Sequence, residues 1–267
     1  MKRKLLASVL VAAGLITTSA AQASFVVGGV DFGQTGSHIE TTTIAETLIN
    51  GNNQILQGYG VISTVNGDST YSLNNDKLYF TFQYTSQNFS ATSVSFINGT
   101  VNVYKGAEIN LLNQSSASNL ATISGYSEWV QFTGHANSNP ANVAAELYSF
   151  GSLTGNTLAF FGSGLLDVNT DGTFGLADVA HALDTNTVSD LLGNKADVAL
   201  TTSGNNFTLN AHDNTAGCRT GSAQAGQWCV AGSADLRGET VPEPGSLALA
   251  GLGILGLFAS RRRKTNI

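Results

Sequence analysis

Charged residues are scarce in this chain and make up only 11% of its 267 residues. Basic residues are the scarcer kind, and seven of the twelve stand near the two ends of the sequence. Between Asp31 and Glu239, five basic side chains are set against seventeen acidic ones, a net charge of about −12. An acidic surface repels phosphate backbones, so the composition argues against nucleic acid as a partner.

The composition also excludes a helical bundle and a disordered chain. Leucine, lysine and glutamate are too few for a bundle, whereas glycine reaches 30 residues and serine, threonine and asparagine are abundant. Hydrophobic residues amount to 42%, which is too many for a disordered segment. Short apolar stretches between Gly, Asn and Ser turns instead predict an all-β fold, an antiparallel β-sandwich or jelly roll forming a single domain at 24–236.

Catalytic motifs are missing as well. The sequence has no G-x-S-x-G elbow, no H-E-x-x-H helix and no P-loop, and its four histidines are scattered. His38 stands two residues before Glu40, so on a strand the pair would share one face. We therefore expect no enzymatic activity and interpret the histidines as surface or packing residues.

Only two cysteines are present, Cys218 and Cys229, separated by a short glycine-rich stretch. In an exported protein a close pair of this kind predicts a disulfide. Two metal-binding thiolates are the alternative, but the sequence offers no second Cys or His pair at ligand spacing.

The first 23 residues have the three parts of a signal peptide. Lys2, Arg3 and Lys4 form a charged segment, residues 5–16 are apolar, and Ala21 and Ala23 form an A-x-A cleavage site. We expect signal peptidase to cut after Ala23, which predicts export; a buried N-terminal helix is the alternative.

The other end of the sequence combines three features in a fixed order. Pro242, Glu243 and Pro244 precede an apolar run at 245–260 and a basic block at 261–264, after a short linker predicted at 237–241. As a helix, the 16 apolar residues would extend about 24 Å, a marginal transmembrane span against a hydrocarbon core of about 30 Å. The basic block belongs on the cytoplasmic side by the positive-inside rule, which leaves the acidic domain outside.

This tail, residues 242–267, resembles the PEP-CTERM sorting signal of Gram-negative bacteria. The resemblance implies an exosortase as processing partner, transient contact with the inner membrane, removal of the tail, and a final place at the cell surface or outside the cell. The two prolines restrict the backbone to extended conformations of the kind that a protease cleft binds. An ordinary C-terminal anchor with a chance Pro-Glu-Pro is the alternative.

Strand patterns dominate the middle of the chain. Alternating or short apolar runs predict strands at 59–65, 78–84, 128–134, 157–162, 197–202, 207–211 and 229–236. Asn98 and Gly99 stand between two further strand patterns, and this dipeptide favours a hairpin turn there. Short helices are expected at 140–147 and 176–183.

A calcium-binding loop is the best candidate for chemistry. Oxygen-bearing side chains occupy positions 1, 3, 5 and 12 of an EF-hand-type loop, with glycine at position 6: Asp167, Asn169, Asp171 and Asp178. Thr173 at position 7 would supply its backbone carbonyl. The preceding residues have a strand pattern where an EF-hand has a helix, and Asn-Thr-Asp-Gly is also a good turn sequence. Calcium binding and a plain turn both stay open.

Three functions are compatible with these observations. The first is a structural or adhesive surface protein within an exopolysaccharide matrix or biofilm. The second is a carbohydrate-binding module or calcium-binding adhesin, in which Trp129 or Trp228 would stack on sugars instead of packing in the core. The third is a secreted hydrolase, which needs carboxylates or a triad converging in a cleft.

Overall fold

The computed structural model describes residues 24–33, 36–137, 142–206, 210–213 and 217–240. The predicted signal peptide and the apolar run at 245–260 lie outside these residues. Within the described part, no helix is both long and apolar enough to cross a membrane.

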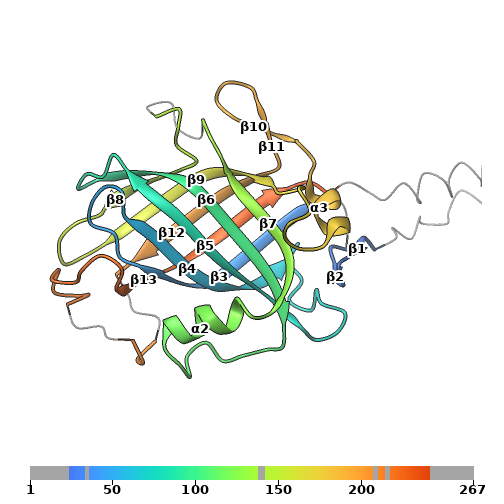
Figure 1. Ribbon diagram of the computed structural model, residues 1–267, viewed down its shortest axis with the longest axis horizontal. Helices are drawn as coiled ribbons and strands as arrows, with labels where there is room; N and C mark the ends of the chain where they lie inside the picture. Colours follow the sequence, from blue (N-terminus) through green and yellow to red (C-terminus); the bar gives the residue numbers. More distant parts are fainter. Residues whose placement is uncertain (1–23, 34–35, 138–141, 207–209, 214–216, 241–267) are drawn as a thin grey trace, which may run out of the picture.

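Nine strands form the main sheet (Figure 1). They are β3 (Ser37–Thr47), β4 (Ile55–Val65), β5 (Lys77–Gln87), β6 (Ser93–Gly106), β7 (Ser127–His135), β8 (Leu147–Ser152), β9 (Ala159–Val168), β12 (Val198–Asn205) and β13 (Trp228–Gly238). Two small hairpins pair β1 (Val26–Val27) with β2 (Val30–Asp31) and β10 (Val188–Ser189) with β11 (Lys195–Ala196). The helices within the described residues are α2 (Ser116–Ile123) and α3 (Ala177–Leu183).

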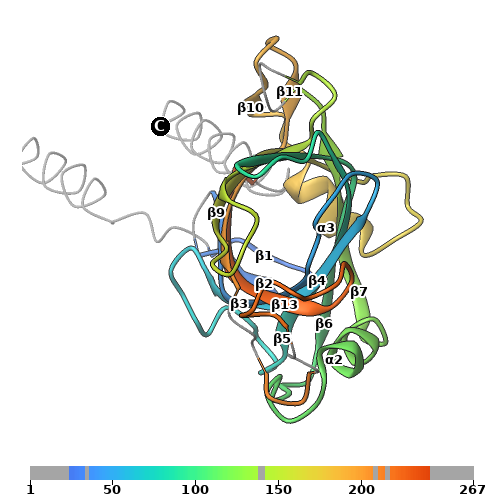
Figure 2. The same cartoon turned by 90° about the vertical axis from the view of Figure 1, so that its left-hand side faces the viewer.

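The sheet closes on itself, as the view along its axis shows (Figure 2). The order runs β12-β13-β3-β4-β5-β6-β7-β9, and β9 pairs again with β12. Strand β8 follows β7 end to end in the place between β6 and β9. All these pairings are antiparallel, which confirms the expected all-β fold. A sandwich would have two separate sheets, whereas this sheet closes into one barrel. Its two edge strands pair with each other, so no long strand edge of the described sheet is left unpaired.

Alternation along the strands puts the main core inside the barrel. On β5, Leu78, Phe80 and Tyr84 point inward and are buried, whereas Tyr79 points outward beneath α2. One end of the barrel is closed by the β1–β2 hairpin and α3, where Trp129 stacks on Phe32. Trp129 is 1% exposed and donates a hydrogen bond to the Gly28 carbonyl oxygen at 3.2 Å, so it is a packing residue.

The hairpin predicted at Asn98 and Gly99 is wrong, because β6 runs through both residues. Asn98 adopts φ = 54°, and the register with β5 shifts there, which makes the dipeptide a bulge. A Cβ atom at Gly99 would overlap the ring of Tyr84, and the Gly99 amide donates to the Glu146 carboxylate at 2.5 Å. Packing across the barrel wall therefore overrides the local turn preference.

The other predicted elements have mixed outcomes. Strands are confirmed at all the predicted places except 207–211, of which 207–209 lie outside the described residues and Asn210 and Ala211 form a turn. Helix α3 confirms the prediction at 176–183, whereas the described part of 140–147 is a turn followed by β8. Strand β13 continues to Gly238, two residues into the predicted linker.

A bulge in β3 decides which acidic side chains enter the barrel. Ile39 and Thr41 point inward, and after the register shifts at Thr41 and Thr43 the inward positions become Ile44 and Glu46. A bulge adds one residue and so exchanges the two faces of a strand. Glu40 consequently lies on the outer surface, while Glu46 lies in the interior.

Candidate functional site

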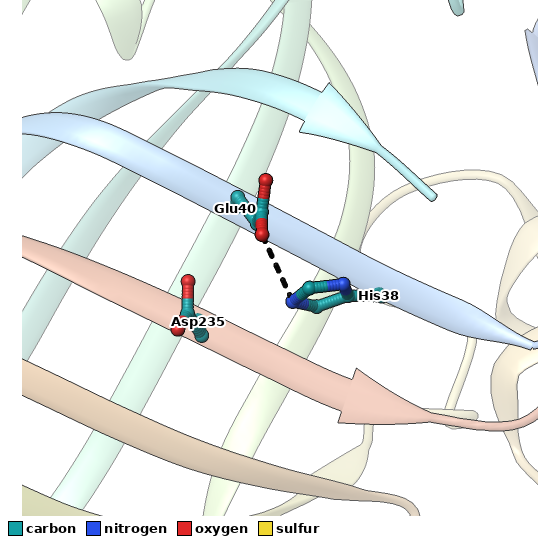
Figure 3. Close-up of side chains that lie close together, drawn as sticks. All are labelled: His38, Glu40 and Asp235. Carbon is teal, nitrogen blue, oxygen red and sulfur yellow. Dashed lines mark ion pairs between the residues drawn. The ribbon is translucent and has the colours of Figure 1, made fainter. Parts of the chain in front are cut away.

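The predicted His38–Glu40 pair does share the outer face of β3 (Figure 3). His38 Nε2 lies 3.3 Å from Glu40 Oε1, and cross-strand pairing on β13 brings Asp235 beside them. One ligand atom from each residue lies within 4.8 Å of the others, and both side chains of the pair are about a third exposed. Exposed groups of this kind are common without a metal, so the cluster is an arrangement of surface charges and supports no site by itself.

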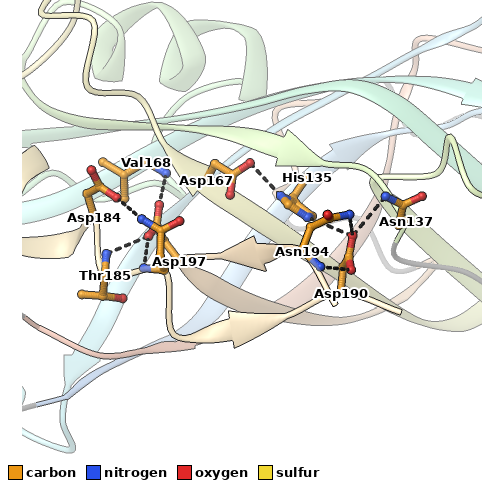
Figure 4. A network of polar contacts seen from close by, with 10 residues as sticks. His135, Asn137, Asp167, Val168, Asp184, Thr185, Asp190, Asn194 and Asp197 are labelled. Atoms are coloured by element: carbon orange, nitrogen blue, oxygen red, sulfur yellow. Dashed lines mark hydrogen bonds and ion pairs between the residues drawn. The ribbon is translucent and has the colours of Figure 1, made fainter. Parts of the chain in front are cut away.

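His135 joins the barrel wall to the β10–β11 hairpin (Figure 4). Its Nδ1 atom lies 2.8 Å from Asp167 Oδ2, and its Nε2 atom lies 3.4 Å from Asp190 Oδ2. Burial raises the pKa of Asp190, but hydrogen bonds from Asn194, Asn137 and two backbone amides outweigh it and hold that pKa well below its ordinary value. Both ring nitrogens face carboxylates, which suits a structural clamp better than a base beside a nucleophile.

A second carboxylate fixes the chain after α3. Asp197 accepts hydrogen bonds from the amides of Thr185 and Asn186 at 2.7 Å and of Val168 at 2.8 Å. These bonds tie the segment after the helix to the end of β9 (Figure 4). Asp190 and Asp197 therefore both accept hydrogen bonds from backbone amides and fix the local backbone.

The three carboxylates among the predicted calcium ligands do not form a cluster. Asp167 pairs with His135, and Asp171 accepts hydrogen bonds from the amide and hydroxyl of Thr173, as in an ordinary turn. Asn169 is bonded to Gln131, and Asp178 accepts from the amide of the following residue. The carboxylates of Asp167, Asp171 and Asp178 do not lie within 4.8 Å of one another. Helix α3 follows the loop as an EF-hand would require, but strand β9 precedes it.

We expect isothermal titration with Ca²⁺ to release no heat from this loop, because its carboxylates are already held by protein donors. A binding isotherm that Asp171→Ala abolishes would show the opposite. Asp68→Ala is the matched control, since Asp68 makes the same turn contacts with Thr70 on another loop.

The predicted disulfide is confirmed. Cys218 and Cys229 are bonded, with their Cα atoms 5.3 Å apart. The bond attaches the loop before β13 to that strand, next to Leu48 at the barrel end opposite α3.

An aromatic ladder that the sequence patterns did not predict lies on the outer face of β8 and β9. We define the ladder as Tyr148, Phe150 and Phe161. The ring centroids of Tyr148 and Phe150 are 6.3 Å apart, as are those of Phe150 and Phe161. Phe150 is 50% exposed and Phe161 62%, so two phenyl rings stand in solvent. The alternation of Tyr148 and Phe150 could have indicated it, but β8 is short and was not predicted.

A groove of about 550 Å³ continues from Phe161 across the outer face. Apart from the apolar side chains of Ile44, Phe160 and Phe161, its walls carry hydroxyl, amide and small side chains from β3, β9, β12 and β13. They include Thr42, Ala159, Ser203, Asn205, Ala231 and Ser233. The lining contains no charged residue. The ladder and the groove together form a neutral surface on an acidic protein.

The tail of the chain matches the family model of the PEP-CTERM protein-sorting motif at residues 240–264. No curated protein and no solved structure matches the chain. The first matched residue, Thr240, is buried and accepts a hydrogen bond from the Gly36 amide at 3.2 Å, so the motif begins where the barrel ends. The chain thus carries a PEP-CTERM sorting motif, which makes it an exported protein directed to the cell surface by an exosortase.

Proposed function

We propose that this exported protein is a non-enzymatic glycan-binding component of the exopolysaccharide matrix of a Gram-negative bacterium. The observation that carries the proposal is the exposed ladder of Tyr148, Phe150 and Phe161 beside an uncharged groove that includes hydroxyl and amide side chains. Export brings the protein into contact with the exopolysaccharide, and the ladder and groove offer side chains that can bind it.

The chemistry of the surface matches a neutral sugar chain. A flat aromatic ring offers an apolar face to the C–H groups of a sugar ring, while hydroxyl and amide side chains exchange hydrogen bonds with its hydroxyls. Contiguous exposed apolar rings rimmed by polar residues mark interaction sites on soluble proteins. Trp129 is excluded from such a role by its burial, and Trp228 packs against Tyr59 with ring centroids 5.6 Å apart.

Native gel electrophoresis through neutral glycans tests the proposal. We expect hydroxyethyl cellulose or dextran in the gel to retard the exported protein. Replacing both Phe150 and Phe161 by serine should weaken binding about tenfold or more, because each ring contact contributes about 0.5–1.5 kcal/mol. Leu112→Ser, at a site 54% exposed outside the ladder, is the matched control and should bind as the wild type does.

A second double variant separates stacking from general apolar contact. Phe150→Leu with Phe161→Leu keeps an apolar surface but removes the flat rings, so it should lose binding as the serine variant does. The proposal would be contradicted if the leucine variant bound glycan as strongly as the wild type does. It would also be contradicted if no neutral glycan retarded the wild type.

A further inference from the structure

The barrel contains an internal cavity of about 90 Å³ lined almost entirely by apolar side chains. The β1–β2 hairpin and α3 close the end of the barrel that carries Trp129. At the opposite end, which we call the loop end, the cavity reaches the segments between strands, where Ile49, Phe89, Leu153 and Leu158 line it. Ile49 and Phe89 are only partly buried, so the loop end is the one nearer to solvent.

A single carboxyl group faces this apolar interior. Among the described residues that line the cavity, Glu46 is the only one with an acidic or basic side chain apart from the phenol of Tyr84. Glu46 is 6% exposed, and within the described part of the chain no hydrogen bond or ion pair reaches its carboxyl. A buried polar group without a partner destabilises a fold, and native proteins rarely contain one without a reason. The reason can be a ligand that supplies the missing partner.

The neighbours of Glu46 on the barrel wall offer it no donor. Glu46 on β3 lies opposite Gly58 on β4 and Val230 on β13. Gly58 lacks a side chain, and the ring of Phe82 occupies the space over it. The hydroxyl of Thr47 also lines the cavity, but it is bonded to the backbone of β4. A hydrogen-bond donor for the carboxyl would therefore come from a bound molecule.

The cavity is polar at one end and apolar along its depth. Glu46 is the last residue but one of β3, and the two residues that follow this strand, Leu48 and Ile49, line the cavity at the loop end. Farther toward α3 the lining includes Ile62 and Leu236. A molecule that enters with its apolar part first would thus leave its polar group beside Glu46, close to water.

We propose that the barrel interior binds a small primary alkylamine, with its ammonium group against Glu46 and its alkyl chain in the apolar cavity. An ammonium group donates hydrogen bonds to a carboxylate and offsets its charge, and such bonds are roughly twice as strong as neutral ones. An alcohol supplies a donor without the charge, and a carboxylate ligand adds a like charge. Calcium needs about six to eight oxygen ligands, which one carboxylate does not provide.

The cavity size limits the alkyl chain. An apolar cavity of about 150 Å³ binds benzene, so a cavity of about 90 Å³ accepts a thin chain of about three or four carbons more readily than a ring. Each buried methylene should raise the affinity about fourfold until the cavity is full. Affinity should then level off with chain length, which distinguishes an enclosed site from an apolar patch on the surface.

NMR titration of the ¹⁵N-labelled exported protein with ethylamine, butylamine and hexylamine tests this site. Burial raises the pKa of Glu46 to about 7, so the titrations are made at pH 8, where the carboxyl is ionised. We expect saturable shifts of backbone amides along the cavity, with affinity that rises and then levels off along the series. Butylamine should bind about tenfold more tightly than 1-butanol, because its hydrogen bond to the carboxylate is between charged groups.

Two variants assign the preference for the amine to Glu46. Glu46→Gln keeps the size of the side chain and should weaken butylamine binding about tenfold, with much less effect on 1-butanol. Tyr84→Phe is the matched control, because it removes the other buried polar group of the lining that has no partner. The Tyr84 ring lies over Gly99 on β6, away from Glu46, so this variant should bind both molecules as the wild type does.

The site inside the barrel is independent of the aromatic ladder on its outer face. Phe150→Ser with Phe161→Ser should therefore bind butylamine as the wild type does, which separates this site from the glycan surface. The proposal is overturned if no amine produces saturable shifts, or if Glu46→Gln binds butylamine as tightly as the wild type. Equal affinity of the wild type for butylamine and 1-butanol would also overturn it.

Discussion

Replacing Pro242, Glu243 and Pro244 together by alanine is expected to leave the exported chain with its tail attached. In the wild type, exosortase processing should yield a surface or secreted product whose intact mass lacks the basic block at 261–264. In the variant we expect this product to fall to a trace, with the full-length tail retained in the cell envelope. Fractionation followed by intact-mass measurement gives the result directly.

The physical reason lies in the backbone of the three replaced residues. Two prolines hold φ near −65° and disfavour helix in the residues before them, which keeps the segment extended for a protease cleft. Alanine is the best helix former and proline the worst, by about 3 kcal/mol per residue. The triple variant would therefore allow a helix formed by the apolar run at 245–260 to continue through the site.

A matched control uses the third proline of the chain. Pro140→Ala changes the same residue type outside the tail and should be processed as the wild type is. The sorting interpretation fails if the triple variant loses its tail to the same extent as this control. A wild-type surface product that still carries the basic block would contradict removal of the tail.

Local patterns in the sequence were enough to predict the elements whose residues interact mainly with their own neighbours. The alternation at 78–84 gave β5, and the short spacing of Cys218 and Cys229 gave the disulfide. Closure of the barrel depends on β12 pairing with β9 and on β13 pairing with β3, which joins segments far apart in the chain. No local pattern indicates such pairings, so a sandwich and a barrel are indistinguishable at that level.

The candidate sites show the same limit more sharply. Sequence patterns indicated Trp129 as a candidate sugar-stacking residue and the loop starting at Asp167 as a candidate calcium site. In the structure Trp129 is buried in the core, and Asp167 pairs with His135. Phe160 and Phe161 are adjacent, yet one lines the interior and the other stands in solvent. Which face a side chain takes depends on register and bulges, and these are set by partner strands.

Glu46→Gln is expected to stabilise the barrel above pH 7 by about 3 kcal/mol. Burial raises the pKa of Glu46 from 4.5 to about 7, whereas the unfolded chain keeps the ordinary value. Each unit of difference corresponds to about 1.4 kcal/mol. Glutamine keeps the size and polarity of the side chain and cannot ionise, so the variant avoids the cost of a buried charge.

The sign follows from proton binding in the two states. Below pH 4.5 Glu46 is protonated in both, and ionisation costs nothing. Between pH 4.5 and 7 the unfolded chain releases the proton while the folded barrel keeps it, so stability falls as pH rises. Above pH 7 Glu46 is ionised in both states, so the loss of unfolding free energy is complete. Tyr84 shares the cavity, but burial raises its pKa further above the ordinary value, so it stays neutral throughout this range.

Urea unfolding of wild type and variant at pH 4.5, 6 and 8 measures the effect. The difference in unfolding free energy should grow from a small value at pH 4.5 to about 3 kcal/mol at pH 8. Glu128→Gln is the matched control, because Glu128 lies on a strand of the same barrel at an exposed position. It should show no comparable growth with pH. A difference between wild type and Glu46→Gln that stays constant from pH 4.5 to 8 would show that Glu46 is not held neutral by burial, since only a group whose pKa differs between the folded and unfolded states makes stability depend on pH.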